Sequence, residues 1–157
     1  MILLNNQEVG TIVISGNLVN IGQVLSVNLT LCKIFKFKEK HKIIKNKIQT
    51  IIPYYIGQFH DTFIKRYFES AKKNILDKDR ILFGLQSTGF IVPFLLHVKM
   101  IPNLNPSTRF LGYLKKLDKE HSFHKTKIFP KNTKISYIMC NSEGSVFGIS
   151  KSVKKNL

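Results

Sequence analysis

The sequence is poor in acidic residues, and this shortage excludes several classes of protein. Only 9 of its 157 residues are Asp or Glu, against 25 Lys or Arg, so the formal net charge is +16. So few acids provide no convincing catalytic pair, and the chain has no glycine-rich phosphate loop and no HExxH, GxSxG or protein-kinase motif. An enzyme is therefore the least supported class, and we expect a non-enzymatic protein.

Cysteine is also scarce, and no histidine lies near a cysteine in the sequence at a spacing typical of metal ligands. Cys32 and Cys140 lie far apart without a CxxC pair or any metal-ligand spacing, so both are predicted to be reduced, partly buried thiols. His121 and His124 have a ligand spacing that a helix allows, but no acidic or thiol partner is near. A metal site usually needs three or four ligands, so we expect none here.

The chain also lacks a recognisable export signal or membrane span. Its first ten residues, MILLNNQEVG, contain no basic n-region and too short an apolar run for a signal peptide. The uncharged stretch 81–98 is long enough to resemble a membrane helix. However, turn residues from Gln86 to Gly89 interrupt it and its apolar residues alternate, which favours two strands of a hairpin. We therefore expect a cytoplasmic domain.

Alternating apolar residues and turn signals predict an antiparallel sheet. From Phe90 to Met100 every second residue is apolar, which is typical of a strand with one buried face. Pro93 removes a backbone donor, so we expect an edge position or a bulge there. The predicted strands cover residues 11–15, 22–28, 81–85, 90–100 and 109–117.

Two segments have helical spacing. In the clearer one, His60 and Asp61 belong to the polar face, and its predicted apolar face consists of Phe59, Phe63, Ile64, Tyr67, Phe68 and Ala71. As adjacent residues on a helix point in different directions, His60 and Asp61 are expected to have a structural role rather than to form an acid/base pair. The other segment has apolar residues at Ile44, Ile48, Ile51 and Ile52, and Pro53 ends it.

The C-terminal part repeats the strand-turn-strand pattern of the opening hairpin over residues 135–150. We predict a main domain over 9–118, a basic connector over 119–134, and a terminal hairpin with a basic tail over 135–157. A lone hairpin is marginally stable unless it docks, so it either packs on the main sheet or begins a second repeat.

Several short motifs in one order make residues 9–118 resemble a PAS domain. After the opening hairpin come Phe35-Lys36-Phe37, the run 42–48 and Ile52-Pro53. The segments FHDTFI at 59–64 and GFIVP at 89–93 look like the signatures of PAS domains in large, multi-spanning membrane proteins of protists. The chain departs from that family at Lys36 and Lys45, where the family usually has glycine.

The resemblance implies an α+β fold, with a five-stranded antiparallel sheet flanked by short helices, to which the terminal segment adds a C-terminal β-hairpin. It also implies small-molecule sensing, dimerisation or protein contact in signalling, at the cytoplasmic face of a membrane within a larger protein. The cofactor is unknown. Cys32 lacks the Asn-Cys-Arg setting of flavin photochemistry, and His97 is expected to be a surface histidine rather than an axial haem ligand.

Six aromatic residues are predicted to surround the space between the helices and the sheet: Phe35, Phe37, Phe63, Tyr67, Phe83 and Phe94. Two explanations remain open. The aromatics either line a pocket for a small molecule or fill the core that a domain of this size needs.

Positive charge is concentrated in four batches, which suggests an alternative function. Seven Lys lie in 33–47, six Lys or Arg in 65–80, seven Lys in 115–134 and three in 151–155. Such clusters can bind nucleic acid or anionic membrane. The aromatics are not interleaved with these lysines, and lysine lacks the fork with which arginine reads bases. The favoured prediction is a PAS-like sensory or protein-interaction module whose partner is a small molecule, a second copy or a neighbouring signalling domain.

Overall fold

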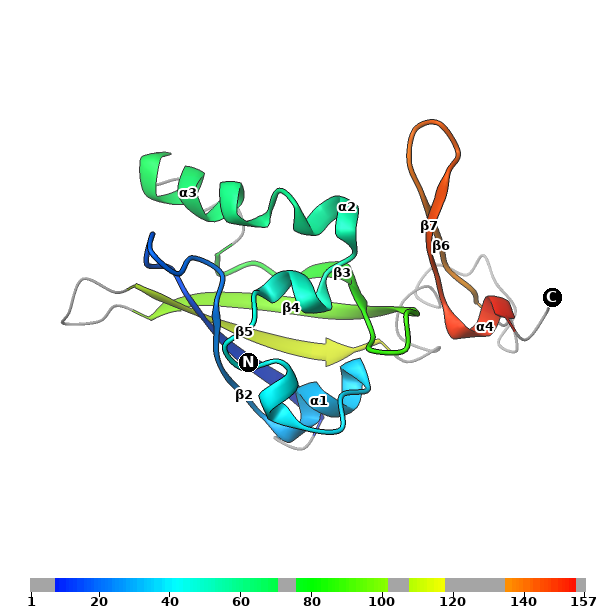
Figure 1. The fold of residues 1–157 in the computed structure, drawn as a ribbon, viewed down its shortest axis with the longest axis horizontal. Coiled ribbons are helices and arrows are strands. Elements are labelled where there is room, and N and C mark those ends of the chain that lie inside the picture. The colour runs from blue at the N-terminus through cyan, green and yellow to red at the C-terminus, as the bar shows by residue number, and fades with distance from the viewer. Residues whose placement is uncertain (1–7, 71–75, 102–107, 118–134, 155–157) are drawn as a thin grey trace.

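The protein folds around a five-stranded antiparallel sheet with helices on one face (Figure 1). The computed structural model describes residues 8–70, 76–101, 108–117 and 135–154. The strands lie in the order β2-β1-β5-β4-β3. They are β1 (Val9–Ser15), β2 (Val24–Val27), β3 (Arg80–Leu85), β4 (Ile91–Ile101) and β5 (Arg109–Lys116). A separate hairpin consists of β6 (Ile138–Cys140) and β7 (Val146–Ile149). The predicted fold class is confirmed.

The helices are short apart from α3. They are α1 (Leu29–Phe35), α2 (Tyr54–Gly57), α3 (His60–Ser70) and α4 (Lys151–Lys154), with two 3₁₀ turns, η1 (Lys40–Lys42) and η2 (Ile48–Ile51). The helix predicted from Ile44 to Ile52 is wrong, because only η2 forms. Lys45 interrupts it with a φ of 69°, a left-handed conformation that cannot continue a right-handed helix.

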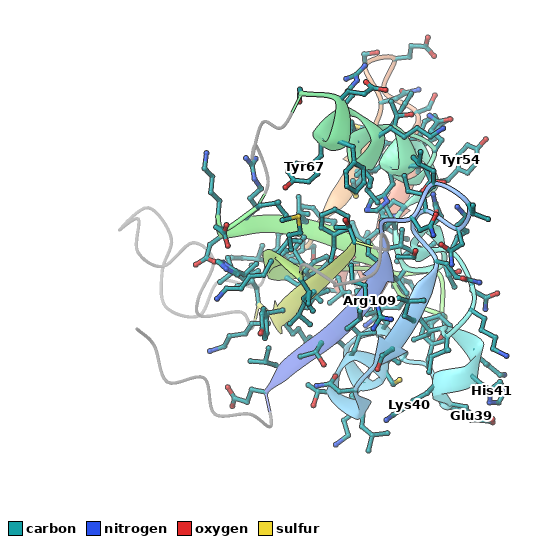
Figure 2. All side chains as sticks on the ribbon, turned by 90° about the vertical axis from the view of Figure 1, so that its left-hand side faces the viewer. Glu39, Lys40, His41, Tyr54, Tyr67 and Arg109 are labelled. Carbon is teal, nitrogen blue, oxygen red and sulfur yellow. The ribbon has the colours of Figure 1, made fainter. Side chains whose placement is uncertain are left out.

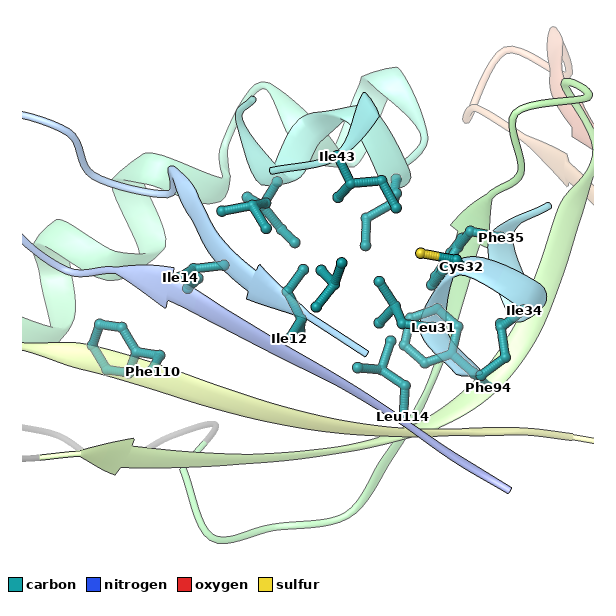
Figure 3. Packing of buried hydrophobic residues seen from close by; sticks show 14 of the residues in the cluster. Ile12, Ile14, Leu31, Cys32, Ile34, Phe35, Ile43, Phe94, Phe110 and Leu114 are labelled. Atoms are coloured by element: carbon teal, nitrogen blue, oxygen red, sulfur yellow. The ribbon is translucent and has the colours of Figure 1, made fainter. Parts of the chain in front are cut away.

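The core lies between α1, α3 and one face of the sheet, which we call the covered face (Figure 3). Its strand residues are those at alternate positions, as the sequence pattern predicts: Ile12 and Ile14 of β1, Phe94 of β4, and Phe110 and Leu114 of β5. Helix α1 adds Leu31, Ile34 and Phe35, which are buried as well. Burial of these side chains is the main stabilising contribution in the fold.

Asn28 connects α1 to the first strand. Its Oδ1 atom accepts hydrogen bonds from the backbone N–H groups of Leu31 (2.9 Å) and Thr11 (3.0 Å), and its Nδ2 atom donates to the Val9 carbonyl (2.8 Å). The first of these bonds caps the helix N-terminus, where backbone donors lack intrahelical partners. The side chain therefore fixes where α1 begins relative to β1.

The uncharged stretch 81–98 is indeed a hairpin, formed by β3 and most of β4. Among the described residues, no helix is long and apolar enough to cross a membrane. The prediction of an edge position or a bulge at Pro93 is wrong, because β4 lies between β3 and β5 and its pairing with β3 continues through Pro93 without a shift in register. The ring is tolerated because β5 ends beside it. Leu117 N–H donates to the Pro93 carbonyl at 3.2 Å, so the missing donor faces the end of β5.

The terminal hairpin docks on the main domain. Tyr137 packs against Phe83 of β3 with ring centroids 5.2 Å apart, and Phe147 packs against Tyr55 of α2 at 4.7 Å. The residue after β7, Ser150, forms a parallel bridge with Ile91 at the start of β4. The domain boundaries and the second repeat stay predictions, and the connector 119–134 lies outside the described residues.

Lys36 and Lys45, at which the motifs of the chain depart from those that they resemble, both adopt the conformation that glycine favours. Lys36, the C-cap of α1, has a φ of 61° and Lys45 one of 69°. A left-handed conformation costs a non-glycine residue about 1–2 kcal/mol. A substitution by glycine removes this cost, but part of the benefit is lost because glycine has a greater conformational entropy in the unfolded chain.

We predict that Lys36→Gly and Lys45→Gly each raise the free energy of unfolding by about 0.5–1 kcal/mol. Urea denaturation measures the change. In the matched control, Lys33→Gly inside α1, the free energy should fall by about 1 kcal/mol, because glycine is a poor helix former. If Lys36→Gly lowered the free energy of unfolding as much as Lys33→Gly does, the inferred backbone strain at Lys36 would be wrong.

Candidate functional site

Phe35 fills the centre of the space between the helices and the sheet (Figure 3). Its side chain is fully buried and meets the ring of Phe94 edge to face, with centroids 5.8 Å apart. Gly84 of β3 lies directly against it. A Cβ atom at position 84 would come within 2.3 Å of Phe35 Cε1 and 2.9 Å of Phe94 Cε1. The absence of a side chain at Gly84 therefore leaves the space that the Phe35 ring fills.

The turn between β3 and β4 binds the backbone of Phe35 and its two neighbours. Ser87 N–H donates to the Phe35 carbonyl (2.9 Å), Ser87 Oγ donates to the Lys36 carbonyl (2.6 Å), and Gln86 Nε2 donates to the Ile34 carbonyl (2.7 Å). These carbonyls belong to the last turn of α1, where no intrahelical donor reaches them. The sheet thus caps the helix that carries the ring.

The other predicted pocket residues do not all meet at Phe35. Phe37 is half-buried and packs on the edge of the core. Tyr67 is half-buried and packs against the same core at Phe110. Its ring lies 5.8 Å from that of Phe110, and its hydroxyl lies 3.2 Å from Met100 Sδ. The role of the six aromatics as a ligand pocket stays a prediction.

Two of the six face away from the space under the helices. Phe83 pairs with Pro93, whereas the adjacent pairs Leu82–Phe94 and Gly84–Val92 contain the buried positions of the covered face. Because side chains alternate along a strand, Phe83 points to the opposite face. Phe63 lies on α3 with its side chain exposed.

The predicted apolar face of α3 is wrong for Phe59, Phe63 and Phe68, which are exposed, although Ile64 is buried and Tyr67 half-buried. His60, predicted on the polar face, is only 23% exposed. The helix is therefore rotated relative to its apolar pattern. The polar contacts of the next residue, Asp61, explain the rotation.

Asp61 anchors α3 to the opening loop and to η2. Its Oδ2 atom accepts from Lys47 Nζ (2.9 Å) and its Oδ1 atom from Gln49 Nε2 (3.0 Å), while Lys47 Nζ also donates to the Ile21 carbonyl. Gly22, with a φ of 72°, lets the carboxylate approach, since a Cβ there would lie 2.7 Å from Oδ1. Burial alone raises the pKa of Asp61. The hydrogen bonds from Lys47 and Gln49 and the charge of Lys47 lower it by more, so the pKa lies below its ordinary value.

His60 is a mostly buried side chain beside this anchor. Burial lowers the pKa of His60, and the nearby charge of Asp61 only partly offsets this effect. The His60 Nδ1 atom has no hydrogen-bond partner among the described residues and lies 3.9 Å from Asp61 Oδ1. That distance is too long for a hydrogen bond, so the two residues are not an acid/base dyad.

The opposite face of the sheet, which we call the outer face, is partly apolar. Its centre is formed by half-buried side chains from three strands: Val13, Leu95, His97, Leu111 and Tyr113. His97 lies opposite Tyr113 in register, and its Nδ1 atom is 2.8 Å from Asp79 Oδ1. The histidine is thus a satisfied surface residue, as expected from the sequence.

A separate shallow hollow lies beside the C-terminal half of α3. It has a volume of about 440 Å³ and is lined by Leu18, Lys65, Phe68 and Glu69. None of the six predicted pocket residues lines it. Nor do the described residues include a group of three or more His, Cys, Asp or Glu side chains that could hold a metal ion.

The thiols differ in environment. Cys32 is buried on α1, and burial raises its pKa, whereas Cys140 is exposed on β6, so the prediction of partial burial is wrong for the latter. Both are free.

No family model matches the sequence. A probable serine/threonine-protein kinase of Dictyostelium discoideum is 27% identical over 96 residues, which are 61% of this chain. The chain spans only 6% of the length of that protein.

Solved structures share the fold. The PAS domain of an HTR-like protein from Haloarcula marismortui has a TM-score of 0.52 and 18% identity, with coverage of 73% of this chain and 86% of that one. A PAS domain from a two-component sensor histidine kinase has a TM-score of 0.53 and 14% identity, with coverage of 73% and 90%. The chain therefore has a PAS fold, as its motifs predict.

The contact between Gly84 and Phe35 predicts a steric penalty. Gly84→Ala should lower the free energy of unfolding by about 1–3 kcal/mol, because the new methyl group overlaps the ring. In the control Gly57→Ala the new methyl group would meet the flexible Gln49 side chain at 3.3 Å, so we expect less than about 0.5 kcal/mol. Urea denaturation tests both. If Phe35→Leu relieves no part of the penalty in the double variant, the assigned contact is wrong.

The lowered pKa of His60 predicts a pH dependence of stability. Because the folded pKa lies below the ordinary value of 6.5, the unfolded chain binds more protons, so the contribution is full above pH 6.5 and is lost as the pH falls below it. The contribution of Asp61 to stability changes with pH only below about its ordinary pKa of 3.8, which is outside this range. Between about pH 7.5 and 5.5 the free energy of unfolding should fall less steeply in His60→Gln than in the parent. Thr62→Ala, at an exposed position of the same helix, should keep the parental slope, and a parental slope in His60→Gln would contradict the prediction.

Proposed function

We propose that the chain is a non-enzymatic PAS-like module of a signalling protein and that it acts through protein contacts. The proposal is supported by its PAS fold, which it shares with a domain of a sensor histidine kinase, and by its similarity to part of a probable protein kinase. As a fold alone does not select a function, the choice among PAS roles depends on the residues of this chain.

The contact of Phe35 with Gly84 is the observation that favours protein contact over ligand sensing. A sensor needs room for its ligand between helix and sheet, and here a buried phenyl ring occupies that room. The ring is fixed at both ends, by Phe94 and by the backbone contacts of Ser87. Opening the space would require α1 to separate from the β3–β4 turn.

The outer face has the composition of an interface. Its apolar centre, with Leu95, Leu111 and Tyr113, is only half-buried, and the cross-strand register makes it continuous across β1, β5 and β4. Charges of both signs surround it, since Lys115 lies 3.9 Å from Glu8, and the carboxylate of Asp79 lies beside His97. Mixed charges permit a second copy to pair with the same surface, and they permit a neighbouring domain as well.

We further propose that the module faces the cytoplasm and belongs to a longer signalling protein at a membrane. Similarity to a small part of a long kinase supports the larger context. In that setting the terminal hairpin, which docks on α2 and β4, is the start of a second unit.

Small-molecule sensing is the second candidate. Phe37 is only half-buried, and Leu82 of the covered face remains exposed. Tyr67 of α3 is half-buried too, so the space beside it is less tightly filled than that around Phe35. A ligand in that space would contact Tyr67 and the sheet beneath it.

Native mass spectrometry of the purified chain tests these roles. We predict a dimer without an added small-molecule mass, because the apolar centre of the outer face is buried when two copies pair. Leu111→Glu should convert it to a monomer, whereas Leu29→Glu, which places the same charge at an exposed site on α1, should not. Circular dichroism checks that each variant is folded. A stoichiometric added mass would favour the sensor, and a monomeric parent would contradict pairing of two copies.

A further inference from the structure

Large apolar side chains are exposed on α2 and at the start of α3. Tyr55, Phe59 and Phe63 follow at intervals of four residues and are 45%, 53% and 43% exposed. Phe63 N–H donates to the Phe59 carbonyl at 3.1 Å, so these two rings lie on one side of α3, because residues four apart share one side of a helix. Tyr55 belongs to α2, which a turn at Gln58 and Phe59 separates from α3. We call the three exposed rings the aromatic stripe.

Other exposed apolar residues extend the stripe. Tyr54 is 75% exposed and Ile56 39%, and Figure 2 shows Tyr54 at the outer margin of the molecule, whereas Tyr67 lies between α3 and the sheet. At one end, Tyr55 packs on Phe147 of the docked hairpin, next to the exposed Val146. A contiguous apolar surface of this kind is typical of a binding site.

The charge beside the stripe is positive. Arg66 follows Phe63 by three residues and lies on the same side of α3, whereas Lys65, two residues after Phe63, lines the hollow with Phe68 and Glu69. The nearest carboxylate, Asp61, is already paired with Lys47. The remaining carboxylate of α3, Glu69, lies four residues beyond Lys65 at the far end of the helix. An occupant with negative charge therefore complements this surface.

The shape and charge of the stripe select among anionic occupants. A second copy would bring Arg66 near its own counterpart, in a chain with a net charge of +16, and like charges repel. Single-stranded nucleic acid binds grooves in which cations follow the backbone. Here the stripe belongs to two helices, α2 and α3, that border the molecule (Figure 1). Ile56 and Val146 are exposed and add aliphatic side chains that suit acyl chains.

We infer that the aromatic stripe docks the domain on an anionic lipid surface, with α2 and α3 lying in the plane of the interface. Tyrosine and phenylalanine rings would enter the boundary between headgroups and acyl chains, as in amphipathic interfacial helices. Arg66 would contact lipid phosphates. The outer face of the sheet lies on the opposite side from α3, so it would stay accessible to a protein partner. This inference goes beyond the proposed function, because it assigns a second binding surface.

Vesicle sedimentation with the whole chain tests the inference. Binding is expected to vesicles of phosphatidylcholine with about 30% phosphatidylserine, to be much weaker on pure phosphatidylcholine, and to fall as salt is raised. The double variant Phe59→Ser/Phe63→Ser should weaken binding at least about tenfold, since each ring removed takes away apolar area that the lipid would bury. Because both side chains are largely exposed, the variant should keep the parental circular dichroism spectrum.

Matched controls separate the stripe from general basicity. Leu29→Ser removes an equally exposed apolar side chain from α1, away from the stripe, and should bind like the parent. Arg66→Gln should weaken binding to the anionic vesicles more than Lys42→Gln on η1 does. Three results would overturn the inference: no binding by the folded parent, equal loss in Leu29→Ser and the double variant, or binding to single-stranded RNA alone.

Discussion

The close approach of Phe35 to Gly84 is the contact on which the rest of the domain depends. A fully buried phenyl ring can lie at this point only because the strand above it has no side chain there. Loss of such a ring from a core typically costs about 3–5 kcal/mol, a large part of the stability of a small domain. Packing of the same ring positions the end of α1 beside the β3–β4 turn, where Ser87 and Gln86 donate hydrogen bonds to the helix carbonyls. Packing and backbone bonding therefore determine one geometry together.

The sequence predicts the sheet well because its signal is local. Alternation along β4 and β5, and the turn chemistry between β3 and β4, identify the strands without knowledge of their partners. The face of a strand is harder to predict, because a shift of one residue moves every side chain to the other face. Phe83 shows this difficulty. Its strand has apolar residues on both faces, and the covered face is the one that contains Gly84.

The orientation of α3 could not be predicted from apolar spacing for a different reason. A rotation that would bury Phe59 and Phe63 would turn Asp61, whose side chain is 30% exposed, away from Lys47 and Gln49. It would also expose Ile64, which is buried three residues further along the same side of the helix. The hydrogen bonds of Asp61 and the burial of Ile64 therefore determine the rotation together. The adjacent positions of His60 and Asp61 in the sequence contain no hint of this, because the partners of Asp61 lie 12 and 14 residues earlier. The exposed aromatic stripe is a result of that competition.

The docking of the terminal hairpin has a mechanical consequence. The segment is attached at three separate points, through the Tyr137–Phe83 ring pair to β3, through the Tyr55–Phe147 ring pair to α2 and through the Ser150–Ile91 bridge to β4. Tension applied to α4 would therefore be shared between a helix that borders the surface and two neighbouring strands of the sheet. Displacement of the hairpin would thus act on α2 and on the sheet at the same time.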